Sequence, residues 1–159
     1  MRRIVALLSV SVAVALLFAV GIAMVPWPAP LVAAQARLVL IEHVSNETVV
    51  DLAGEGDSVG DMLVFSNELY DDRNVNLVGS SHGSCVRTVV GESWDCTFTT
   101  SMEQGSLVVV GLFYDEGRGA FAIVGGTGDY AGADGQMSLK ASETSTTEHP
   151  EWEFTFDIR

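Results

Sequence analysis

Two polar side chains stand on otherwise apolar segments and could take part in chemistry. Glu42 shares one face of the segment 37–43 with Leu38 and Leu40. A carboxylate that points into an apolar interior has its charged form disfavoured, so Glu42 could donate or accept a proton near neutral pH. Asn67 could orient an oxygen atom of a ligand. Two alternatives stay open: Glu42 as a solvated residue at the end of a strand, and Asn67 as a residue bonded to a turn.

The glycine-rich stretch FAIVGGTGDYAGADGQM, residues 121–137, has the glycine content of a phosphate-binding loop. A helix should follow such a loop, and none is indicated here. Its charged residues are Asp129 and Asp134, which would repel phosphate. We interpret the glycines as residues that permit positive φ at turns. No ligand spacing connects the three histidines, so we expect no metal site.

Cys85 and Cys96 enclose the sequence VRTVVGESWD, with a turn signal at Gly91. Two strands folded back at this turn would place the cysteines opposite each other. We therefore predict a disulfide that contributes about 3 kcal/mol, with two buried thiols as the alternative. Arg87 has the strand parity of Cys85. It either points inward toward an acid group of a ligand or lies solvated at the rim.

The N-terminal segment has the order of a secretory signal. Arg2 and Arg3 precede an uncharged apolar run over 4–25, and small residues end at Ala36. We expect residues 1–36 to be a cleaved signal peptide and the remaining 37–159 to form one secreted or extracytoplasmic domain. The run of 22 residues is also long enough for a membrane anchor, which needs about 20.

The charge of the mature domain limits its partners. All 21 acidic residues lie beyond the predicted cleavage site, against six basic ones, a net charge of −15. Such a surface repels the phosphates of nucleic acid. We exclude nucleic acid as a partner.

The elements that must position these side chains are strands. The C-terminal EWEFTFDIR alternates strictly between apolar and polar residues, and SWDCTFTTSM does the same. Period two with aromatic and β-branched residues is typical of half-buried strands. The same pattern predicts eight strands in all: 37–43, 60–67, 77–90, 93–102, 106–114, 119–125, 135–142 and 151–158.

Short connections favour antiparallel neighbours, and eight such strands fit a closed β-barrel around one small ligand, or a sandwich. SLVVVGLFY and AFAIV are apolar on both faces, so one face could line the barrel while the other packs against a second subunit. The large aromatic residues that point inward are predicted as core or cavity lining: Trp94, Phe98, Trp152 and Phe154.

Four motifs together resemble the allene oxide cyclase family and its relatives, the plant dirigent proteins. GDMLVFSNELY, VGSSHGSC, GSLVVVGLFY and AIVGGTGDYAGADGQMSL occur in the family's order between residues 60 and 139. The resemblance implies an all-β, eight-stranded antiparallel barrel with an apolar cavity, assembled as a homotrimer. It also implies an isomerase that closes a reactive intermediate into a ring without any cofactor.

The resemblance assigns cavity positions one by one. Phe65 and Asn67 match the cavity Phe and Asn of the cyclase, Cys85 matches a cavity Cys, and Glu42 matches the catalytic Glu across a gap. Phe113 takes the place of a cavity Tyr.

Other positions depart from the family. Val44 replaces an Asn of the cyclase, VSNETVVDL lacks its Ser-Pro loop, and Asp134 replaces the Arg of the last dirigent loop.

Two hypotheses of function follow. In the first, a secreted barrel binds a small apolar molecule and guides its cyclisation by restricting its conformers. Glu42 would then polarise or protonate the ligand and Asn67 would orient it. In the second, the same barrel is a non-catalytic carrier of a hydrophobic ligand or a structural envelope protein.

Overall fold

The computed structural model of the protein describes residues 36–159, which fold as one all-β unit. The predicted signal peptide or anchor helix, with its cleavage site, lies outside the described residues apart from Ala36. Within 36–159, no helix has the length and apolar character needed to cross a membrane.

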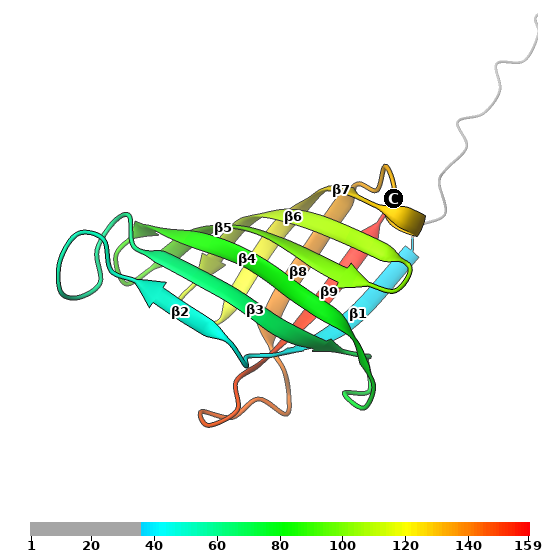
Figure 1. The fold of residues 1–159 in the computed structure, drawn as a ribbon, viewed down its shortest axis with the longest axis horizontal. Helices are drawn as coiled ribbons and strands as arrows, with labels where there is room; N and C mark the ends of the chain where they lie inside the picture. The colour runs from blue at the N-terminus through cyan, green and yellow to red at the C-terminus, as the bar shows by residue number, and fades with distance from the viewer. Residues whose placement is uncertain (1–35) are drawn as a thin grey trace, which may run out of the picture. The chain divides into compact units, whose positions relative to one another are not determined.

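Eight antiparallel strands close into a barrel, as the sequence predicted (Figure 1). Neighbouring strands pair in the order β1-β9-β8-β7-β6-β5-β4-β3, and pairing between β1 and β3 closes the ring. The closed strands are β1 (Ala36–His43), β3 (Met62–Tyr70), β4 (Leu77–Val89), β5 (Ser93–Met102), β6 (Gly105–Tyr114), β7 (Arg118–Gly126), β8 (Gly135–Ala141) and β9 (Glu151–Ile158).

The strand that sequence analysis did not predict is β2 (Glu47–Val50), which pairs with the first half of β3. It continues the line of β1 after a short interruption at 44–46. Glu47 is five positions after Glu42 along the chain, but their partners Phe65 and Leu69 are only four positions apart. The chain therefore contains a one-residue bulge, and a bulge reverses which face the following residues occupy.

The interior of the barrel has a filled half and a hollow half. Fully buried aliphatic and aromatic side chains fill the half near β1's start and η1 (Gly128–Tyr130), among them Leu69, Leu107, Met137 and Phe156. Toward the other end the strands instead carry several inward glycines. Gly83, for example, faces Phe65 on β3 and Phe98 on β5, and places no side chain between them.

The glycine-rich loop serves as a turn, in agreement with its interpretation from sequence. Gly128 and Gly132 have φ of 60° and 80°, a region that side chains disfavour. Only the three-residue η1 follows β7, so no helix N-terminus is formed for a phosphate.

Cys85 and Cys96 are directly paired across β4 and β5 and form the predicted disulfide. The bond lies in the wall of the hollow half.

Candidate functional site

The hollow half contains a cavity of about 240 Å³. This volume lies just below the range of about 300–1,000 Å³ that holds drug-sized ligands, so it suits a small molecule. Most of its wall is apolar. The lining consists of Glu42, Val44, Glu47, Leu63, Phe65, Asn67, Cys85, Cys96, Phe98, Phe113, Phe121, Leu139, Pro150, Trp152 and Phe154.

The aromatic rings of the wall pack on one another at edge-on or tilted angles. Phe98 contacts Phe65, Phe121 and Phe154 at centroid distances of 5.7, 5.2 and 5.6 Å. Phe113 and Trp152 pack edge to face at 5.4 Å. Such contacts hold the rings in place, so the cavity has a fixed shape.

Glu42 is the most perturbed acid of the cavity. Its side chain is buried, at 4% exposure, so the alternative of a solvated residue is wrong. Burial raises the pKa of Glu42 from 4.5 to about 7, against the opposing effect of hydrogen bonds from Ser81 and Asn67. A carboxyl with this pKa exists in both protonation states near neutral pH and can exchange a proton with a ligand.

Asn67 links the cavity to the bulge between β1 and β2. Its Oδ1 accepts hydrogen bonds from the backbone N–H groups of Ser45 and Asn46, each at 3.0 Å. Its side-chain amide also bonds to Glu42. Asn67 therefore holds the irregular backbone and orients the buried carboxyl at the same time.

Glu47 is a second carboxylate of the cavity. On an unbroken strand, residues five apart point to opposite faces. The extra residue of the bulge turns Glu47 to the same face as Glu42. Glu47 therefore pairs with Phe65 and lines the same interior as Glu42. Desolvation raises the pKa of Glu47, and its charge in turn raises the pKa of Glu42.

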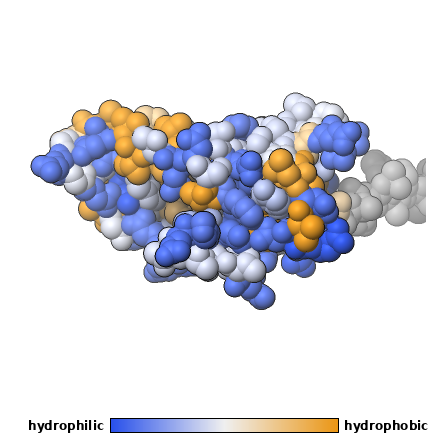
Figure 2. Space-filling model, turned by 60° about the horizontal axis from the view of Figure 1, so that its bottom comes forward, coloured by the Kyte–Doolittle hydropathy of each residue, from blue (hydrophilic) through white to orange (hydrophobic). Residues whose placement is uncertain are grey.

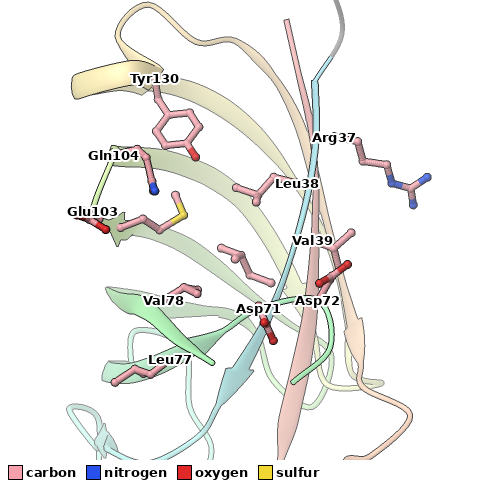
Figure 3. A pocket seen from close by; sticks show the side chains of 12 residues that line it. Arg37, Leu38, Val39, Asp71, Asp72, Leu77, Val78, Glu103, Gln104 and Tyr130 are labelled. Atoms are coloured by element: carbon pink, nitrogen blue, oxygen red, sulfur yellow. The ribbon is translucent and has the colours of Figure 1, made fainter. Parts of the chain in front are cut away.

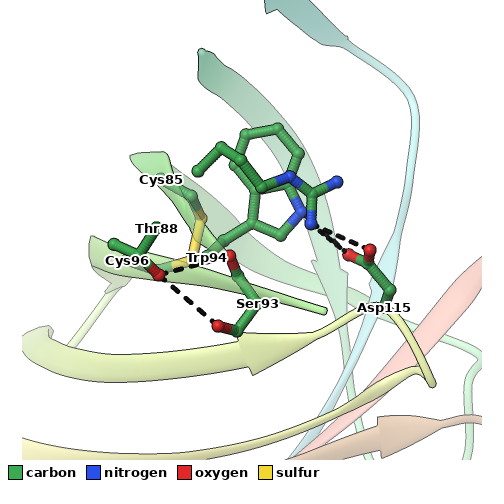
Figure 4. The surroundings of a disulfide bond; sticks show 7 residues. Cys85, Thr88, Ser93, Trp94, Cys96 and Asp115 are labelled. Atoms are coloured by element: carbon green, nitrogen blue, oxygen red, sulfur yellow. Dashed lines mark hydrogen bonds and ion pairs between the residues drawn. A yellow bond between two sulfur atoms is a disulfide. The ribbon is translucent and has the colours of Figure 1, made fainter. Parts of the chain in front are cut away.

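Trp94 lies close to the disulfide (Figure 4), and with Arg87 it lines a separate depression outside the cavity. The Arg87 guanidinium stacks over the Trp94 ring at 3.9 Å and forms ion pairs of 2.7 Å with both Asp57 and Asp115. Trp94 Nε1 donates to Asp115 at 3.0 Å. Trp94 thus belongs to the core rather than to the cavity wall, and Arg87 is buried rather than solvated.

A larger depression of about 690 Å³ lies at the η1 end (Figure 3). Leu38 and Tyr130 point into it, whereas Arg37 points away. Of its three acids, Asp71, Asp72 and Glu103, Asp71 accepts hydrogen bonds from the N–H groups of Val75 and Asn76, which lower its pKa and use its oxygens within its own loop. The cavity around Glu42 combines burial, a raised pKa and convergent polar groups, and we take it as the candidate site.

Comparison with protein families identifies the fold. A family model described as Dirigent-like protein matches residues 38–158. The chain belongs to the dirigent-like family. No curated protein sequence matches the chain.

Solved structures share this dirigent-like barrel. A pyocyanin demethylase superposes with a TM-score of 0.65 at 25% identity, covering 78% of this chain and 100% of that chain. A pterocarpan synthase dirigent protein superposes with a TM-score of 0.65 at 20% identity, covering 79% of this chain and 95% of that chain. A Diels-Alderase from Streptomyces koyangensis superposes with a TM-score of 0.61 at 17% identity, covering 77% of this chain and 63% of that chain.

The dirigent-like barrel brings most of the expected positions to one place. Phe65, Asn67, Cys85, Phe98 and Phe113 line the cavity together with Glu42. Sequence analysis did not single out Glu47, because strand alternation locates an inward residue only when the position of the bulge is known. It also missed Ser81, whose hydroxyl donates to Glu42. The pattern VGSSHGSC holds the clue, since its inward residues are all small.

Among residues 36–159, no group of acidic, His and Cys side chains is arranged to hold a metal ion.

Proposed function

We propose that this dirigent-like barrel binds a small, largely apolar molecule in the Glu42 cavity and guides its cyclisation. The observation that carries the proposal is the buried Glu42, whose pKa of about 7 occurs inside a rigid aromatic pocket. The similar structures include proteins named as a Diels-Alderase and a heme-binding cyclase of a [4 + 2] cycloaddition, which supports a ring-forming role. At their identity they share the fold alone.

Shape and one acid group account for the proposed catalysis. The aromatic wall restricts a flexible intermediate to a folded conformer, which removes much of the entropic barrier to ring closure. Protonated Glu42 donates its proton to an oxygen of the intermediate, and the resulting carboxylate takes a proton back as the product forms. Nothing is consumed, so we expect an isomerase that needs no cofactor.

The test compares wild type, Glu42→Gln and the outward-facing control Asp95→Asn on a reactive lipid epoxide, supplied as its uncharged methyl ester. Wild type and the control should give one enantiomer of the cyclic product in excess. Removal of the acid should lower the rate about 10²-fold or more. If all three proteins give the rate and the racemic product of buffer alone, the catalytic proposal is wrong.

A non-catalytic carrier is the second candidate, and the departures from the cyclase pattern favour it. Val44 and Phe113 lie in the cavity wall, at the positions where the resemblance placed a polar Asn and Tyr. Native mass spectrometry of protein purified from its own host separates the two candidates. An unreacted ligand retained in the cavity supports a carrier, whereas an empty cavity that turns over added substrate supports the cyclase.

We further propose that the barrel works as a homo-oligomer, a trimer by its family resemblance. Apolar residues are exposed on its outer face over β4, β6 and β7: Val86, Val110, Leu112 and Val124. Figure 2 shows hydrophobic residues gathered in separate patches on an otherwise hydrophilic face. Light scattering after gel filtration should give three times the monomer mass, and Leu112→Glu should reduce it.

Export of the chain is part of the same proposal. The disulfide between Cys85 and Cys96 is the kind of bond that persists in oxidising compartments. Mass spectrometry of the exported protein should find an N-terminus at Arg37. An N-terminus at Met1 in a membrane fraction would indicate an anchor instead.

A further inference from the structure

We propose that the cavity selects a small ligand that carries an aromatic cation, and that Glu47 at its mouth sets this preference. The inference rests on the proposed ligand-binding role of the cavity. It names the class of ligand, which distinguishes a planar cation from the fatty-acid anion that a cyclase of lipid epoxides would receive.

The first argument is the sign of the charge in the cavity. Its lining contains two carboxyl groups, Glu42 and Glu47, and no Lys, Arg or His. The basic residues nearby are already paired. Arg87 lies between Asp57 and Asp115, and His43 Nε2 contacts Asn74 and Glu151 at 2.6 and 3.4 Å. The only charged side chains that line the cavity within residues 36–159 are therefore acidic.

The second argument is the state of Glu47. In residues 36–159 the side chain of Glu47 takes part in no hydrogen bond or ion pair, although it lines a mostly apolar space. Its residue is exposed, so Glu47 lies at the mouth rather than deep in the cavity. A partly desolvated carboxylate without a partner gains most from a cation or an N–H donor that enters beside it.

The third argument is the geometry of the mouth. Trp152 and Phe113 lie in the same lining as Glu47, and Pro150 borders it from the loop before β9. Tryptophan is the best aromatic partner of a cation, and desolvation strengthens the contact. Because β2 pairs only with β3, no strand within residues 36–159 covers its other edge beside Glu47.

The surface charge of the domain acts in the same direction. Its six basic and 21 acidic residues give a negative field around the mouth. Such a field concentrates cations near the opening and repels anions, with an effect that salt weakens.

The experiment compares three two-ring probes of nearly equal shape: the cation N-methylisoquinolinium, the neutral 2-methylnaphthalene and the anion 2-naphthoate. Binding is followed by NMR through the indole N–H signal of Trp152, which reports on the cavity and not on the outer surface. The proteins are wild type, Glu47→Gln and Asp95→Asn. Asp95 is an exposed residue on β5 that points away from the interior. Its variant removes one negative charge, as Glu47→Gln does, but outside the cavity.

We expect wild type to bind the cation about tenfold more tightly than the neutral probe, and the anion not at all. Glu47→Gln should remove most of this advantage and leave the affinity for 2-methylnaphthalene unchanged, whereas Asp95→Asn should change neither.

Equal affinity for cation and neutral probe, or equal effects of the two variants, would overturn the inference while ligand binding itself stands. If no probe moves the Trp152 signal, the proposed ligand-binding function fails as well.

Discussion

The two halves of the barrel interior are built from the same strands but filled differently. In the half near η1, Leu69, Leu107 and Phe156 are completely buried. In the other half the strands carry inward glycines, a disulfide and aromatic residues, and they enclose about 240 Å³. The wall of the hollow half contains both of the cavity's acidic groups.

The difference indicates a division of roles. A filled core supplies packing energy, because voids lose both transfer and contact energy. The hollow half gives up part of that energy and buries a carboxyl, a combination that marks functional sites. Substitutions should therefore lower stability in the filled half, and change ligand binding or pH dependence in the hollow one.

The largest effect is expected from Phe156→Ala in the filled half. Phe156 has no exposed surface and packs against Phe154 at 6.4 Å, so its loss leaves a cavity. The free energy of unfolding should fall by about 3–5 kcal/mol. Urea denaturation under oxidising conditions measures it. A loss below about 1 kcal/mol would mean that this half is not tightly packed.

The next effect concerns Glu42 and pH. Its pKa is 4.5 when solvated and about 7 in the folded protein, so between these values the folded state retains a proton that the unfolded state releases. Stability should fall as pH rises from 4.5 through 7, by about 3 kcal/mol in total. Glu42→Gln should lack this decline and be the more stable protein at pH 8.

Denaturation of wild type and Glu42→Gln at several pH values gives the free energy of unfolding of each protein as a function of pH. The contributions of the other acids are common to both proteins and cancel in the difference. Parallel curves between pH 4.5 and 8 would show that Glu42 is not held in a desolvated site.

The disulfide in the wall of the hollow half should contribute somewhat less to the free energy of unfolding than Phe156 and the protonation of Glu42 do. Replacement of Cys85 and Cys96 by Ala frees a short loop of the unfolded chain, and we expect a loss of about 2–3 kcal/mol. Denaturation with and without reductant checks it. Reductant should destabilise the wild type and leave the double variant unchanged. Sensitivity of the double variant to reductant would contradict this account.

The smallest effect on stability is expected from Phe113→Leu at the cavity mouth. Phe113 is half-buried and packs on Trp152, so a similar apolar side chain should cost less than about 1.5 kcal/mol. The affinity for 2-methylnaphthalene should nevertheless fall about five- to tenfold, because an aromatic contact is lost. A large loss of stability with unchanged affinity would place Phe113 in the filled half.

Much of the fold was predictable because strand alternation is local. The eight barrel strands and the inward face of β5, with Trp94, Cys96 and Phe98, follow from the order of residue types. The pairing of Cys85 with Cys96 followed from one turn signal between them. Alternation also placed Glu42 on a face with two leucines, but it left open whether the carboxyl is buried or solvated, which the structure decides.

The sequence by itself determined which residues form strands and which side of each strand is apolar, because both depend on neighbours two residues apart. Only the tertiary structure decided where the interior stays empty and which acids share it. The bulge that turns Glu47 inward is held by Asn67, about twenty residues away along the chain. The burial of Arg87 likewise depends on Asp57 from the loop before β3 and on Asp115 from the end of β6, which approach it only when β4, β5 and β6 have paired and that loop has folded.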